Sequence, residues 1–283
     1  MASVDIATAP DAARTRRPRT RRSLTGGSGL ALGVTMIWFS LLVLIPLTAV
    51  LISAAGLGLG GFWEVVTQPQ TAAALRLTVV ESLMVTALNV VMGTALAWVL
   101  VRDRFWGKSL VDIVIDVPFA LPTIVAGLVL LSLYGPSSPL GVNVANTRIA
   151  VFLALAFVTL PFVVRTVQPV LESLELDVEE AAASLGAGRF AAFRRVILPS
   201  LIPAIAAGAA LSFARGISEY GSLVLLSGNL PAQTEVASVR VLTFIENGNR
   251  EAASAVAAIM LLVALLVILV LDVIQRRLAR RGD

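Results

Sequence analysis

Long apolar runs alternate with short polar segments along most of the chain. Six runs are each long enough to cross about 30 Å of hydrocarbon, which takes about 20 helical residues. They cover residues 30–55, 77–101, 113–134, 149–171, 200–227 and 253–273. Lipid offers no partners to backbone polar groups, and the runs lack the alternating polarity of barrel strands. The pattern therefore predicts an all-α integral membrane protein with about six transmembrane helices.

Polar segments lie at both ends of the chain and between the fourth and fifth runs. Residues 1–29 are rich in Arg, Pro, Gly and Ser, a composition typical of a disordered tail. Residues 30–275 form one predicted transmembrane domain, which the polar segment 172–199 interrupts. Residues 276–283 form a second, short basic tail.

Lysine and arginine are distributed unevenly between the segments. With the N-terminus inside, the inner segments carry sixteen of them and the outer segments carry four. Positive residues favour the cytoplasmic side of a membrane. The bias predicts that both termini, and with them the polar segment 172–199, lie in the cytoplasm.

Composition excludes several classes of function. The 283 residues are 57% hydrophobic and 14% charged, whereas a soluble domain has about 25% charged residues. The chain contains no Cys and no His, which removes disulfides, thiol chemistry and the commonest general base and metal ligands. A membrane enzyme would depend on scattered carboxylates such as Glu81, Asp112 and Asp116, and we interpret the last two as capping or helix-packing groups. We predict no catalytic residue, no metal site and no nucleic-acid partner.

The polar segment before the fifth run has a defined local pattern. Asp177 followed by Glu180 is a capping box, and apolar residues then recur at helical spacing. Gly186 is predicted to end this helix in the left-handed conformation, and Pro199 to end a second short helix and open the next. Two short helices about a glycine favour a rigid plug for a groove in another protein over an amphipathic segment on the membrane surface.

Six positions of this segment carry a family resemblance: Glu180, Ala181, Ala182, Gly186, Leu198 and Pro199. They resemble the EAA loop of the permeases of ABC importers. The resemblance implies a type I permease architecture over 30–275, with 172–199 as a cytoplasmic coupling loop that docks into an ABC ATPase. The six residues are then the expected ATPase-coupling residues.

The chain lacks a complete phosphate-binding loop of its own. Gly107-Lys108-Ser109 matches the end of that motif, but Arg102 stands where its leading glycine is required. We therefore expect this chain to bind no cofactor, and ATP to be used by a partner subunit.

Prolines interrupt the third and fourth runs. Pro118 and Pro122 each remove a backbone donor, as does Pro161. Such breaks are tolerated where a helix packs on protein or lines a cavity, so a structural kink and part of a pathway or gate fit equally well. Arg165 is expected near the inner face, where its side chain would extend to the membrane surface in a structural role.

The fifth run places two charged residues in the middle of a predicted span. Arg215 and Glu219 are four residues apart, so they share a helix face and are expected to pair. A charge at that depth costs at least about 2.5–3.5 kcal/mol, and such residues often mark a pathway. We favour a structural role for Glu219. For Arg215, holding a gate and facing a passing anion both remain open, and Ser218 and Pro122 are further candidates for the path.

A narrower resemblance covers residues 30–277. The sequence ARGISEYGS from Ala214 to Ser222, and Phe119-Ala-Leu-Pro-Thr123 before it, resemble the sulfate/thiosulfate permeases of the T (U) type. Ser218 departs from that pattern, which leaves the fine substrate preference open. The resemblance implies inward transport of sulfate or thiosulfate across the plasma (inner) membrane. It also implies three partners: a second homologous permease, a dimeric cytoplasmic ABC ATPase and an external sulfate-binding protein.

Two other classes of transporter remain as alternatives. Molybdate/tungstate ABC permeases share the Arg…Glu-aromatic-Gly pattern, usually with Phe at the position of Tyr220. A secondary transporter driven by an ion gradient would not need the coupling loop.

Overall fold

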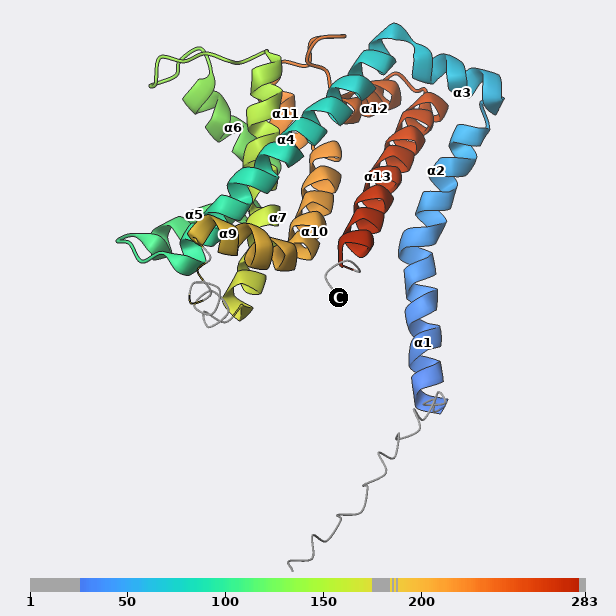
Figure 1. Cartoon of the computed structure of the whole chain (residues 1–283). Coiled ribbons are helices and arrows are strands. Elements are labelled where there is room, and N and C mark those ends of the chain that lie inside the picture. Colours follow the sequence, from blue (N-terminus) through green and yellow to red (C-terminus); the bar gives the residue numbers. More distant parts are fainter. Residues whose placement is uncertain (1–25, 175–183, 185, 187, 280–283) are drawn as a thin grey trace, which may run out of the picture. The chain divides into compact units, whose positions relative to one another are not determined.

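The computed structural model describes residues 26–174, 184, 186 and 188–279. Within these ranges every regular element is a helix, which confirms the predicted all-α class (Figure 1). The helices are, in chain order, α1 (Gly26–Phe39), η1 (Ser40–Leu44), α2 (Ile45–Ala55), α3 (Gly58–Thr67), α4 (Pro69–Arg102), α5 (Lys108–Ala120), α6 (Thr123–Tyr134), α7 (Arg148–Ser173), α9 (Arg189–Ala192), η2 (Phe193–Ile197), α10 (Leu198–Ile217), α11 (Gly221–Leu226), α12 (Ala237–Glu246) and α13 (Arg250–Ala279).

The chain divides into two compact units, Met1–Leu47 and Thr48–Asp283. The described part of the first consists of α1, the π-helical turn η1 and the start of α2. The second contains the rest of α2 and all the later helices, and it carries the candidate site.

Five helical segments of the described residues are long and apolar enough to cross a membrane. They are Gly29–Ala55, Pro69–Arg102, Arg148–Ser173, Phe190–Ile217 and Arg250–Arg277. The bent pair α5 and α6 makes a sixth if it is counted as one span, which agrees with the predicted number.

Helix α4 packs along α7 and α10 (Figure 1). Glycines permit the close approach, because a side chain at Gly93 or Gly208 would collide with Val163 of α7. The amide of Asn89, at the middle of α4, donates to the hydroxyl oxygens of Thr159 and Ser212 at 2.8 and 3.4 Å. One buried polar contact therefore joins three long helices.

The third apolar run is not one helix. Helices α5 and α6 meet at an angle of 118°, with Leu121 in an extended conformation between them. Proline disfavours the helical conformation in the residue before it, so a break at Leu121–Pro122 costs little. Pro118, by contrast, lies inside α5. Of the two prolines, Pro122 therefore marks the break.

The fifth run also differs from its predicted limits. Its helical segment begins at Phe190, passes through the π-turn η2 and continues as α10 to Ile217. Pro199 occupies the first turn of α10, where proline needs no hydrogen-bond partner for its nitrogen, and it does not end the preceding helix. At the other end the chain leaves the helix at Ser218 and starts α11 at Gly221, so 200–227 is a broken run.

Candidate functional site

The break between α10 and α11 is organised by the carboxylate of Glu219. Its Oε1 accepts hydrogen bonds from the backbone N–H and the hydroxyl of Ser222, both at 2.8 Å. The carboxylate therefore satisfies a free N–H in the first turn of α11, for which Tyr220 provides no side-chain cap. Glu219 therefore ends one helix and starts the next.

Arg215 and Glu219 form the expected ion pair, although Glu219 lies beyond the end of α10 and not on the same helix face. Arg215 Nη2 lies 2.7 Å from Glu219 Oε2, and the Glu219 side chain is 1% exposed against 28% for Arg215. A buried carboxylate needs a counter-charge and hydrogen-bond donors, and Glu219 has both. The pair lets a charged group sit inside the protein at a helix break.

The backbone at this break is also held by hydrogen bonds. The hydroxyl of Ser238, in α12, donates to the carbonyl of Glu219 at 2.7 Å. The hydroxyl of Ser218 donates to the carbonyl of Arg215 at 3.1 Å. Both ends of the break are thus fixed by side chains, one of which comes from a different helix.

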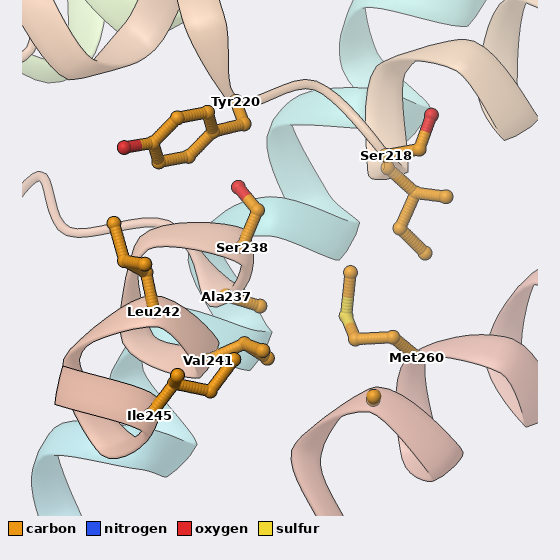
Figure 2. Close-up of a pocket in the computed structure, with 10 residues that line it drawn as sticks. Ser218, Tyr220, Ala237, Ser238, Val241, Leu242, Ile245 and Met260 are labelled. Carbon is orange, nitrogen blue, oxygen red and sulfur yellow. The ribbon is translucent and has the colours of Figure 1, made fainter. Parts of the chain in front are cut away.

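A pocket of about 430 Å³ opens beside the break (Figure 2). Ser218 and Tyr220 line it from the break, and Ser238 from α12. Figure 2 shows Met260 of α13 on the side opposite Leu242 of α12. The rest of the wall is apolar, and the hydroxyls of Ser218 and Ser238 are bonded to the backbone carbonyls of Arg215 and Glu219.

The two helix breaks meet in space. A side chain at Gly221 would collide with Thr123, the first residue of α6 after Pro122. One at Gly127 would lie 2.6 Å from the carbonyl oxygen of Ser222. The fold therefore brings together the starts of α6 and α11, which directly follow Pro122 and Glu219–Tyr220, two separately predicted parts of the path.

The predicted coupling residues fall partly outside the described residues, as Glu180, Ala181 and Ala182 do. Gly186 has a φ of +84°, the left-handed conformation that the sequence predicts there. Leu198 and Pro199 form the first turn of α10.

Sequence reasoning missed the partners of Arg165. Its guanidinium binds Asp112 Oδ1 and both carboxylate oxygens of Asp116, each at 2.7 Å. Of the two predicted roles for the aspartates, capping and helix packing, the contacts fit packing, because they join α5 to α7. Their spacing of four residues, opposite the one arginine of the fourth run, is the signal that could have suggested the contact.

Comparison with known proteins identifies the family. The family model of binding-protein-dependent transport system inner membrane components matches residues 89–282. The chain belongs to this family. It is a multi-pass membrane permease of a transport system and not an enzyme.

Several relatives resemble this permease over most of its length. It is 45% identical to the sulfate transport system permease protein CysT of Synechocystis sp. over 250 residues, 86% of this chain and 87% of that protein. Identity to CysT of Escherichia coli is 40% over 269 residues, 93% of this chain and 97% of that protein.

A solved structure supports the fold. A chain of a bacterial alginate ABC transporter, in complex with an alginate-bound periplasmic protein, superposes with a TM-score of 0.74. The match covers 89% of this permease and 94% of that chain at 18% identity. The type I permease architecture expected from the sequence is therefore confirmed.

Proposed function

We propose that this permease carries sulfate or thiosulfate inward across the plasma (inner) membrane as one subunit of an ATP-driven importer. The observation that carries the proposal is 40–45% identity to sulfate transport permeases over 86–93% of the chain. Sulfate is doubly charged and strongly hydrated, so it cannot cross hydrocarbon unaided. Molybdate or tungstate is the less favoured cargo, because the similar relatives named above are sulfate permeases.

The permease would lie in the lipid membrane and work with three kinds of partner. A second homologous permease completes the pathway, a cytoplasmic dimer of ABC ATPases supplies the energy, and an external sulfate-binding protein delivers the anion. ATP is bound by the ATPases, and this chain itself holds no cofactor. Transport is a rigid-body transition between inward- and outward-facing packings of the helices.

ATP-driven motion would enter the permease at the coupling loop. The proposed coupling residues are Glu180, Ala181, Ala182, Gly186, Leu198 and Pro199. Small alanines suit a helix that sits in a shallow cleft, and the left-handed Gly186 sets the direction in which the chain leaves it. The second half of the loop forms α9 and η2, and α10 continues from them to Arg215.

The breaks at Pro122 and at 218–220 are the proposed gate on the translocation path. Two observations support this role: the breaks lie against each other, and Arg215 and Glu219 form a neutral pair beside a pocket with Ser218 in its wall. The Glu219 carboxylate neutralises Arg215, so Arg215 would bind a passing dianion only weakly. Weak binding suits an anion pathway, because the anion must also be released.

Uptake of radiolabelled sulfate tests the cargo. Cells that lack this permease are compared with and without it restored, in the presence of excess unlabelled thiosulfate or molybdate. We expect restored uptake that thiosulfate blocks. Unchanged sulfate uptake together with a lost molybdate response would contradict sulfate as the cargo and favour the molybdate branch.

A further inference from the structure

Arg165 uses most of its hydrogen-bonding capacity on a single neighbouring helix. Besides the three carboxylate contacts, its Nη2 donates to the carbonyl oxygen of Asp112 at 2.7 Å. Nη1 also donates to Gln168 Oε1, at 2.6 Å, within α7 itself. An arginine that binds two carboxylates and a backbone carbonyl of a neighbouring helix fixes the distance between the two helices and the rotation of one relative to the other.

Helix α5 has few other attachments within this chain. It is described throughout, and Ile115 is its one buried side chain. Its remaining aromatic contact is the edge-to-face pair of Phe119 with Phe162 of α7, with ring centroids 4.9 Å apart. The Arg165 cluster is therefore the principal polar link between α5 and the rest of the chain.

The position of this cluster connects two parts of the proposed mechanism. Helix α7 ends at Ser173, at the start of the coupling loop, and the carbonyl oxygen of Leu174 accepts a hydrogen bond from Arg102 of α4. Helix α5 ends at the break before Pro122, beyond which α6 lies against α11. A rigid link between α5 and α7 would carry motion from the loop to this break.

We propose that Arg165, Asp112 and Asp116 form a clamp that makes α5 and α7 move as one body during transport. Arg165 is then a positioning residue that delivers the loop's motion to the break at Pro122. The inference rests on the proposed function, since it concerns how ATP hydrolysis is coupled to import. The side chains of Arg165, Asp112 and Asp116 are 27%, 43% and 50% exposed, and a simple ion pair at that exposure contributes little. The clamp therefore depends on its multidentate geometry between two helices.

The first test removes all three charges while keeping side chains of similar size. The variant Arg165→Gln/Asp112→Asn/Asp116→Asn leaves no unpaired carboxylate behind, and it is measured in the complete transporter with its binding protein. We expect normal assembly and ATPase activity, with sulfate imported per ATP reduced roughly tenfold. Unchanged import per ATP, or failure to assemble, would overturn the clamp.

The control removes an ion pair that lies within one helix. Asp272 and Arg276 of α13 are 2.8 Å apart and four residues apart in sequence, so their pair links no two elements. Asp272→Asn/Arg276→Gln should leave import per ATP unchanged. The wild-type complex is the reference: absence of sulfate uptake there contradicts the proposed function, whereas a loss confined to the triple variant concerns the clamp.

A covalent bridge tests the rigid-body claim directly. Because the chain contains no cysteine, Phe119→Cys/Phe162→Cys introduces one thiol on each helix. The thiols are joined by a short bifunctional thiosulfonate in a transporter whose partner subunits carry no accessible cysteine. We expect bridging to leave uptake by this double-cysteine variant unchanged. When the same two cysteines are placed in the triple neutral variant, we expect bridging to restore import per ATP. A bridge that blocks uptake would show that α5 and α7 must separate, which would overturn the proposal.

Discussion

At the scale of single residues, Glu219 combines three roles. Its carboxylate pairs with Arg215 and binds the first turn of α11, while its backbone carbonyl accepts the hydroxyl of Ser238 from α12. The two side-chain contacts join α10 to α11, so a change in this one side chain acts on both helices. Within a low-dielectric interior such a network is sensitive to the loss of any member.

We predict that Glu219→Gln reduces sulfate uptake at least tenfold. It leaves Arg215 without its counter-charge, and breaking a buried pair by removing one partner costs about 3–5 kcal/mol. Ser222→Ala is the matched control, because losing one hydroxyl hydrogen bond costs about 0.5–1.5 kcal/mol and preserves the charge pair. Uptake is measured together with the amount of assembled complex.

Replacing both charged residues separates a gate from a packing role. In Arg215→Met/Glu219→Met no unpaired charge remains, so we expect assembly to survive while uptake is lost. Loss of assembly instead would support a purely structural pair, and normal uptake would contradict both roles.

The close approach of α6 and α11 also depends on single residues. We predict that Gly127→Ala destabilises the transporter by about 1–3 kcal/mol, because the added methyl would overlap the backbone at Ser222. Gly60→Ala in α3 is the control, since its new methyl meets nothing within 4 Å. Thermal unfolding of the purified complex distinguishes them, and equal melting temperatures would refute the packing argument.

At the scale of helices, the breaks and the coupling loop determine what can move. Long segments such as Pro69–Arg102 are continuous and packed on one another, whereas the chain changes direction sharply at Pro122 and leaves α10 at Ser218. Motions in packed proteins concentrate at the few positions that absorb backbone changes. The helices on either side of the breaks are therefore the elements that we expect to rearrange.

We predict that Gly186→Val uncouples ATP hydrolysis from transport without preventing membrane insertion. Valine at a φ of +84° is strained by about 1–3 kcal/mol, so the direction of the coupling loop would change. Gly188→Ala is a nearby control, because Gly188 does not have a left-handed φ and a methyl there meets nothing within 4 Å. ATPase activity and sulfate uptake are measured side by side, and normal uptake by the valine variant would reject this role for Gly186.

The sequence predicts the spans well because hydropathy over about 20 residues is a local property. The left-handed Gly186 and the pair of Arg215 with Glu219 are local as well, so both were predictable. The choice of Pro122 over Pro118 as the break was not, because it depends on what packs against each turn. The contacts of Arg165 with α5 likewise join residues 49 and 53 positions apart, which no local pattern specifies.

At the scale of the whole molecule, the charge distribution predicts one orientation in the membrane. Because the chain has no native cysteine, labelling of a single introduced cysteine shows on which side of the membrane that residue lies. We predict that Ala2→Cys and Asp283→Cys are labelled by an impermeant maleimide only in inverted vesicles. Asn143→Cys, in an exposed loop between α6 and α7, should be labelled only from outside. The opposite pattern would contradict the cytoplasmic position of the coupling loop.

The most direct test of ATP-driven sulfate import uses the complete transporter in proteoliposomes. Permeases, ATPases and sulfate-binding protein are reconstituted, and radiolabelled sulfate accumulation is measured with ATP or a non-hydrolysable analogue on the cytoplasmic face. We expect accumulation against a gradient that requires both ATP hydrolysis and the binding protein. Two results would contradict this function: sulfate accumulation driven by an ion gradient without ATP, or ATP hydrolysis by the complete transporter without sulfate accumulation.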